Sequence, residues 1–178
     1  ENTMYASVAV GNREPNGDDL TKNPTEPKPE QLIDYELGYK MKSKKIVASV
    51  NFYYMYYNDQ LVLTGEIDDV GNGVRQNVSK SFRTGIEVQA GYKISKLLRI
   101  DANATFSKNI IKAFDYLVYD TQYDPNTYDV VSYAPVGTEY KDTNIAFLSE
   151  TIVGTTLTFS PIENLDFGLI SKYVGKQY

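Results

Sequence analysis

Histidine and cysteine are both absent from this chain of 178 residues. Their absence excludes disulfide bonds, thiolate and imidazole metal sites, and every mechanism with a cysteine nucleophile or a histidine base. Positive charge is also sparse, because 18 Lys and Arg stand against 23 Asp and Glu, for a formal net charge of −5. Binding to a nucleic-acid backbone needs clustered positive charge, so we expect no nucleic-acid partner. Most common enzyme classes are excluded as well, and we expect no catalytic residue, no cofactor and no metal.

Long hydrophobic runs are missing too. No segment approaches the roughly 18 apolar residues of a membrane-spanning helix, and no basic start followed by an apolar stretch marks a signal peptide at Glu1. Transmembrane strands stay open, because each needs only about 9–11 residues that alternate apolar with polar. Tyrosine, in contrast, is abundant, with 16 Tyr and 7 Phe against no Trp. Its apolar ring and polar hydroxyl suit boundaries between apolar and aqueous regions.

Apolar residues recur at every second position along most of the chain, which is the period of a β-strand. In the segment 33–42, for example, Tyr35 lies on an apolar face and Glu36 on a polar one. The sequence therefore predicts an all-β protein with about seven strands. The predicted strands are 4–10, 33–42, 46–57, 82–94, 98–107, 153–159 and 165–173.

The connections between these strands alternate in length. The short ones are 43–45, 95–96 and 161–164, and the long ones are roughly 14–30, 61–81 and 110–150. Short turns at one end and long loops at the other are typical of an antiparallel up-and-down meander in an outer membrane. A soluble or surface β-sandwich that binds glycans or proteins shares the alternation and is the alternative. A porin without active transport shares it as well.

Tyrosines lie near both ends of the predicted strands. Tyr54, Tyr56 and Tyr57 are at the long-loop end, and Tyr39 and Tyr92 are near the short turns. Two such levels are expected of the aromatic girdles that mark the two membrane interfaces of a barrel.

Several segments, in this order, carry a family resemblance. They are NREPNGDD at 12–19, KPEQL at 28–32, DYELGY at 34–39, NFYYMYYNDQL at 51–61 and SFRTGIE at 81–87. Together they resemble the C-terminal part of the β-barrel of TonB-dependent outer-membrane receptors of the Bacteroidetes type. The similarity extends over nearly the whole chain.

The resemblance implies a fold, a location and a function. Residues 1–178 would be part of a 22-stranded transmembrane β-barrel in the cell outer membrane, with the plug domain and the remaining strands outside this chain. The partners it implies are outer-membrane lipid, the TonB complex through regions absent from this chain, and an extracellular small-molecule ligand. An iron-siderophore or haem type compound is the cargo that the family most often imports.

The third long connection supplies the predicted ligand-binding residues, since aromatic rings in an external loop can stack on an incoming ligand. These residues are Tyr116, Tyr119, Tyr123, Tyr128 and Tyr133. The alternative is that the rings only pack the loop against its neighbours. Oxygen ligands are also dense in this loop, but it lacks the Gly and the terminal Glu of an EF-hand, so no calcium site is predicted.

Charged residues on the predicted strands form a second candidate set. They are predicted to face the barrel lumen or to contact the plug, because the lipid side of a barrel does not hold charge cheaply. These residues are Glu36, Arg83, Glu87, Arg99 and Asp101. The alternative is a cross-strand ladder of charges that keeps the strands in register.

Overall fold

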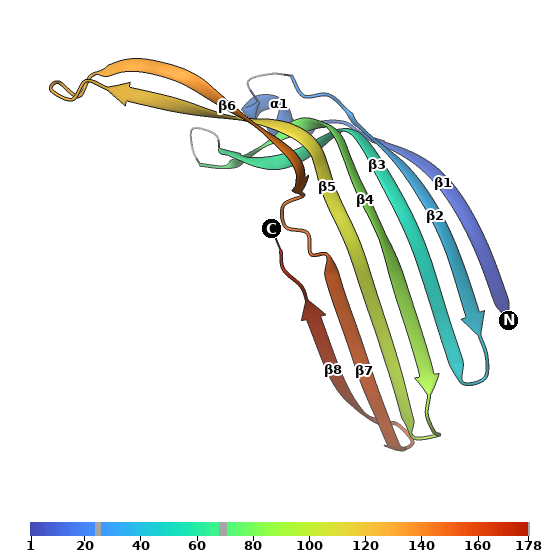
Figure 1. Cartoon of the computed structure of the whole chain (residues 1–178). Helices are drawn as coiled ribbons and strands as arrows, with labels where there is room; N and C mark the ends of the chain where they lie inside the picture. The colour runs from blue at the N-terminus through green and yellow to red at the C-terminus, as the bar shows by residue number, and fades with distance from the viewer. Residues whose placement is uncertain (24–25, 68–70, 178) are drawn as a thin grey trace.

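The structure, a computed structural model, describes residues 1–23, 26–67 and 71–177, with their side chains except those of 64–67, 116–121 and 132–137. One antiparallel sheet dominates it (Figure 1). Its strands are β1 Asn2–Arg13, β2 Glu30–Lys42, β3 Ile46–Ile67, β4 Gly73–Lys93, β5 Leu98–Tyr123, β6 Val130–Asn144, β7 Thr151–Ile162 and β8 Leu165–Val174. The helix α1 spans Gly17–Lys22. In the described part of the chain, no helix is long and apolar enough to cross a membrane.

The strands follow one another across the sheet in the order β1-β2-β3-β4-β5-β7-β8, and β6 pairs with β5 off this path. The all-β antiparallel meander is therefore confirmed. The third connection differs from the prediction, because part of 110–150 forms a hairpin that pairs Ile110 with Asn144 and continues to Tyr123 and Val130. Eight strands result rather than about seven. The tip of this hairpin lies far from the rest of the sheet (Figure 1).

Short turns join the strands at one end of the sheet. Ser43 and Ser95 begin two of them, and each serine hydroxyl accepts a hydrogen bond from a backbone N–H three residues later, of Ile46 at 3.0 Å and of Leu98 at 3.1 Å. Such local bonds replace strand pairing at the reversal of the chain. The predicted positions of the short turns are confirmed to within two residues.

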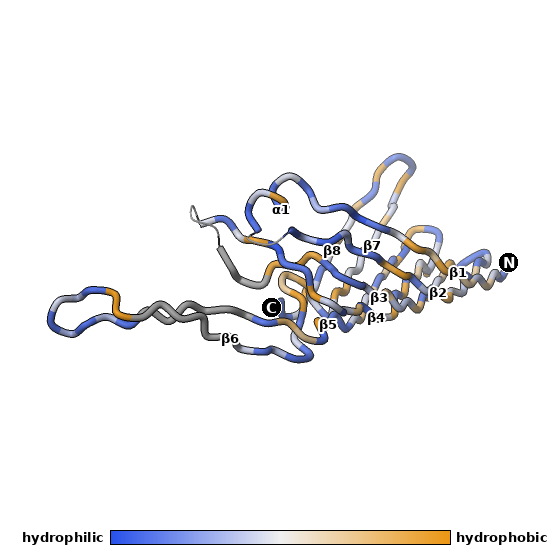
Figure 2. The backbone as a smooth tube through the Cα atoms, turned by 90° about the horizontal axis from the view of Figure 1, so that it is seen from above, coloured by the Kyte–Doolittle hydropathy of each residue, from blue (hydrophilic) through white to orange (hydrophobic). Residues whose placement is uncertain are grey.

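One face of the sheet is apolar and open. Leu37 stands opposite Ala6 on β1 and Phe52 on β3, and this row continues through Ile86 to Phe106. Leu37, Phe52 and Phe106 are each about half exposed, at 52%, 50% and 49%. In the described part of the chain no second layer covers this face (Figure 2), whereas a β-sandwich would bury it against another sheet. The sandwich alternative is therefore disfavoured.

The opposite face is polar, and tyrosine rings lie flat across it. Tyr5 of β1 covers Gly38 of β2, where a Cβ atom would collide with the ring, and its hydroxyl donates to Asn51 Oδ1 of β3 at 3.0 Å. Tyr53 covers Gly85 in the same way on the next pair of strands. Glycine is required at both positions, because only a residue without a side chain leaves room for the ring.

The buried apolar residues gather where the long loops begin. Val62, Val78, Ile111 and Ile145 form the core cluster, and Val78 is only 1% exposed. Phe114 and Leu148 pack against the cluster. This small core joins β3, β4 and β5 to the segment after β6, so the loop bases are held together independently of the middle of the sheet.

Candidate functional site

A hollow of about 700 Å³ lies on the polar side, at the base of the long loops. Three arginines reach it, Arg13 from β1 and Arg75 and Arg83 from β4. Its lining residues are Arg13, Glu30, Tyr57, Gln60, Leu61, Val62, Leu63, Gly73, Arg75, Arg83, Ile145, Ala146 and Phe147. The hollow therefore combines positive charge with aromatic and aliphatic surface.

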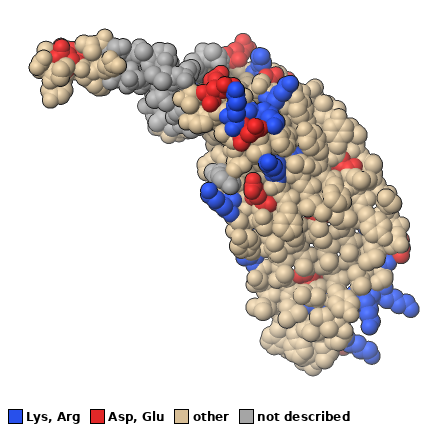
Figure 3. All heavy atoms as spheres, in the orientation of Figure 1, with Lys and Arg blue, Asp and Glu red and all other residues tan. Residues whose placement is uncertain are grey.

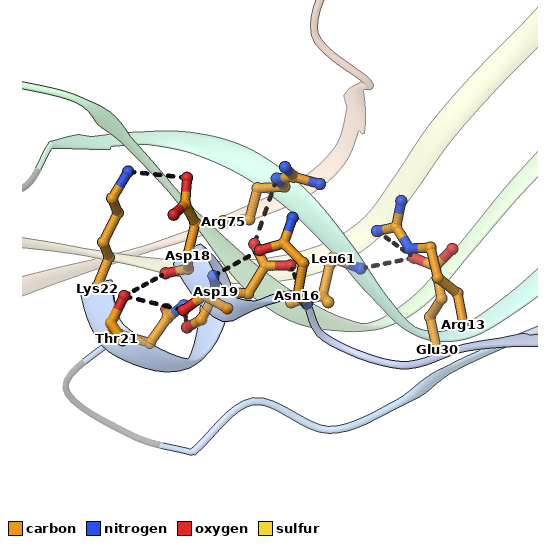
Figure 4. A network of polar contacts seen from close by, with 11 residues as sticks. Arg13, Asn16, Asp18, Asp19, Thr21, Lys22, Glu30, Leu61 and Arg75 are labelled. Carbon is orange, nitrogen blue, oxygen red and sulfur yellow. Dashed lines mark hydrogen bonds and ion pairs between the residues drawn. The ribbon is translucent and has the colours of Figure 1, made fainter.

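Arg13 is fixed by the neighbouring strand. Its Nη2 lies 3.1 Å from Glu30 Oε2, and the same oxygen accepts a hydrogen bond from the backbone N–H of Leu61 at 3.1 Å (Figure 4). The Glu30 side chain is only 13% exposed, which limits screening of the pair by water. One carboxylate thus ties β1, β2 and β3 together at the loop end.

Arg75 is held by α1. The helix begins with a capping box, in which the Asn16 side chain accepts from the N–H of Asp19 at 2.8 Å and the Asp19 side chain accepts from the N–H of Asn16 at 3.0 Å. Asp19 is also 3.4 Å from Arg75 Nε and only 5% exposed (Figure 4). The same carboxylate therefore caps the N-terminus of the helix and anchors the first long loop to β4.

Arg83 retains free hydrogen-bonding capacity. Its guanidinium lies 5.1 Å from the centre of the Tyr57 ring, a cation–π distance. Among the described residues its buried Nε atom has no hydrogen-bond partner, and neither has Asp34 Oδ1. Both residues stand at the level of Met55, which pairs with Asp34 on one side and with Arg83 on the other. Buried polar atoms without partners are costly, so this level of the polar face calls for a further polar group.

A family model described as TonB dependent receptor-like, beta-barrel matches residues 1–178. The chain belongs to this family. Its members are outer-membrane proteins, and one open apolar face beside one polar face is typical of their strands. No curated protein sequence matches the chain.

Solved receptors share the fold. The chain is similar to the copper transporter OprC, with a TM-score of 0.68, 17% identity, and coverage of 97% of this chain and 23% of that one. It is similar to the siderophore receptor PirA from Pseudomonas aeruginosa, with a TM-score of 0.62, 16% identity, and coverage of 99% and 28%. For the FrpB iron transporter from Neisseria meningitidis the TM-score is 0.60, with 16% identity and coverage of 97% and 24%. The chain spans about a quarter of the length of these receptors.

The register of the sheet places all five predicted inner charges on its polar face, but not in one site. Arg83 lies in the hollow, whereas Arg99 and Asp101 pair at 2.6 Å near the short turns and line another hollow of about 730 Å³. Glu36 and Glu87 stand between these levels, opposite Tyr53 and Asn51 of β3. Among the described residues, none of the five forms an ion pair across strands.

The predicted tyrosine site lies elsewhere in the receptor barrel. Tyr123 and Tyr128 are 57% and 78% exposed at the tip of the β5–β6 hairpin, away from the hollow (Figure 1). The side chains of Tyr116, Tyr119 and Tyr133 lie outside the described residues.

The tip of the hairpin is closed by Asp124. Its carboxylate accepts from the backbone N–H groups of Asn126 at 2.7 Å and Thr127 at 3.2 Å, and these bonds hold the pKa of Asp124 below its usual value. The carboxylate thus serves an Asx turn. Among the described residues, no group of three or more acidic side chains could hold a metal ion.

Sequence reasoning missed Arg13, Arg75 and Phe147 as members of the hollow. The alternation that identifies strands ends before all three, and Arg13 and Arg75 are held at the site by ion pairs with Glu30 and Asp19. Phe147 is 71% exposed and has a positive φ of 63°, so it is displayed rather than packed. A usable signal was the NREPNGDD segment, in which Arg13 precedes a capping box.

Proposed function

We propose that residues 1–178 are one part of a TonB-dependent active transporter that binds and imports a scarce extracellular ligand, an iron-siderophore or haem type compound. The observation that carries the proposal is that the family model matches the whole chain, which forms a sheet with one apolar face and one polar face. Similar folds are found in proteins named a siderophore receptor, a ferric enterobactin receptor and an iron transporter, which supports the cargo class.

The rest of the transporter would complete the barrel. We infer a barrel of 22 strands of the Bacteroidetes type, a plug domain in its lumen, and contact with the TonB complex through regions outside this chain. Lumenal charges support the plug, because Glu36, Arg83 and Glu87 form no ion pair among the described residues and would gain polar partners from it. The unpartnered atoms of Asp34 and Arg83 support it most directly, since a plug segment at that level would supply their hydrogen bonds.

The hollow at the loop bases is the proposed place of ligand contact within this part of the barrel. Arg83 brings a cation with a free donor, and Tyr57 and Phe147 bring rings. Iron chelators present anionic oxygens, often on aromatic groups, and this combination matches both kinds of surface. The tyrosines at the hairpin tip, with Tyr116, Tyr119 and Tyr133 on its stem, are a second proposed contact on the way in.

Uptake by the full-length receptor tests the proposal. Cells that carry the receptor should accumulate radioactive iron from one ferric siderophore or from haem, and should lose this uptake when the TonB complex is deleted. Arg83→Gln should weaken binding of that compound, whereas Lys44→Gln, a matched loss of charge at a short turn, should not. Uptake that continues without the TonB complex would favour the porin alternative, and import of none of these compounds would refute the cargo class.

A further inference from the structure

The lipid-facing side of the sheet carries charge at one place only. In the described strands of the meander, from the short turns up to residue 112, its positions are uncharged except for Lys80 of β4 and Lys108 and Lys112 of β5. All three are cations on adjacent strands. Charged side chains are sparse over the middle of the sheet in Figure 3 and gather toward its two ends. A lipid-facing charge is costly unless something at that depth binds it.

Lys80 and Lys112 lie just above an aromatic level, and Lys108 lies within it, opposite Thr84. Phe82 stacks with Tyr54 at a ring distance of 5.9 Å, and Lys112 Nζ lies 5.2 Å from the centre of the Phe82 ring. Lys80 precedes Phe82 by two residues on β4. Ile110 of β5 is paired with Phe82, and Lys112 follows Ile110 by two residues. Aromatic residues mark the boundary between the acyl chains and the headgroups, so the amines reach the headgroup layer.

Among the described residues, one ion pair involves a lysine of this set. Lys112 Nζ pairs with Asp142 Oδ1 of β6 at 2.8 Å, and both this pair and the charge of Lys108 hold the pKa of Asp142 below its usual value. The Asp142 side chain is 66% exposed and that of Lys112 52% exposed, so the pair is open to a competing anion. Three cations against one carboxylate leave the cluster positive.

We propose that Lys80, Lys108 and Lys112 form a site for the phosphate groups of a phosphorylated glycolipid of the outer leaflet. The lysines supply charge-assisted hydrogen bonds to phosphate oxygens. The uncovered apolar face directly below them, with Phe106 49% and Val88 36% exposed, lies where the acyl chains of the same molecule run. This continuity favours a lipid over a soluble anion. The inference rests on the outer-membrane location of the family and not on the cargo.

The test uses the full-length receptor in detergent, with diphosphoryl lipid A and its dephosphorylated form as probes and native mass spectrometry as the readout. The wild type should bind the phosphorylated lipid roughly tenfold more tightly. Combined Lys80→Gln, Lys108→Gln and Lys112→Gln should abolish this preference, and Lys→Arg at the same positions should retain it. The matched control of Lys42→Gln, Lys44→Gln and Lys96→Gln loses equal charge near the short turns and should keep the preference.

Removal of the competing carboxylate gives the opposite prediction. Asp142→Asn releases Lys112 and should strengthen the preference for the phosphorylated lipid, which keeps the site testable even where the triple glutamine variant does not assemble. An unchanged preference in the triple variant would overturn the proposal. Displacement of the lipid by inorganic phosphate at equal concentration would also overturn it, since the site would then bind a free anion. Either result leaves uptake of the cargo unaffected.

Discussion

The middle of the sheet and its outer end are stabilised in different ways, although the same strands run through both. Among the residues whose side chains are described, the buried apolar ones all lie toward the outer end: Tyr57, Leu61, Val62, Val74, Val78, Ile110, Ile111 and Ile145. In the middle, large side chains such as Leu37 and Phe52 stay half exposed. The middle of the sheet therefore has no buried apolar core among the described residues, whereas the outer end has a small core of its own.

The largest expected effect comes from placing a charge on the apolar middle. Val88→Arg should lower the free energy of unfolding in bilayers by about 2–4 kcal/mol, because the new cation would face acyl chains. Denaturant titration of the refolded full-length receptor in vesicles measures this loss. The neighbouring change Gln89→Arg points into the lumen and should cost little. Equal losses for the two variants would show that the faces are wrongly assigned.

Loss of packing at the outer end should have a smaller and more local effect. Val78→Ala removes two methyl groups from a side chain that is 1% exposed, and should destabilise the loop bases by about 2 kcal/mol. Hydrogen exchange should quicken around Ile111 and Ile145 but not in the middle of the strands. Val10→Ala, at a lipid-facing position that is 63% exposed, is the control. Faster exchange along the whole of β4 would contradict an independent outer core.

The anchor of the first long loop sharpens the comparison further. Asp19→Asn keeps an acceptor for the capping box but loses the charge that faces Arg75, and should weaken the loop by about 1–2 kcal/mol. Limited proteolysis within 14–29 of the receptor should become faster. Asp18→Asn serves as the control, because Asp18 is 74% exposed in a pair with Lys22 that contributes little. Identical digestion of the two variants would refute the anchoring role.

The smallest effect is expected at the tip of the hairpin, which neither core nor lipid stabilises. Because its turn depresses the pKa of Asp124, the turn should be ordered above the usual range of Asp and should loosen only as pH falls through the lowered value. Carboxyl carbon shifts of labelled aspartate in the receptor would report the midpoint. Asp124→Asn should remove the transition, and a midpoint at or above the usual value would contradict the turn.

The middle of the sheet could be predicted from the sequence because its two environments are chemically distinct. Tyr35 and Leu37 alternate with Asp34 and Glu36, and the structure pairs this strand as the alternation requires. The hairpin of β5 and β6 extends beyond the region where the two faces alternate between apolar and polar residues. Its strands are paired by backbone groups that every sequence possesses, so the sequence did not reveal how far the hairpin extends.

The hollow at the loop bases was hidden for another reason. Arg75 meets Asp19 only after α1 folds over β4, and Arg13 meets Glu30 only in the register of β1 and β2. No local pattern encodes such meetings. Arg83 was identified on its own strand, but the sequence did not reveal that Tyr57 would lie beneath its guanidinium.

The tyrosines that lie over Gly38 and Gly85 influence the width of the barrel. The width of a closed barrel follows from the number of its strands and from how far each is staggered against the next. A slip of two residues would bring Glu36 or Lys40 beneath the ring of Tyr5, in place of the one residue that leaves it room. The two glycines thus fix the stagger of their strands. Bulkier residues at these positions would shift the stagger and so change the width of the barrel.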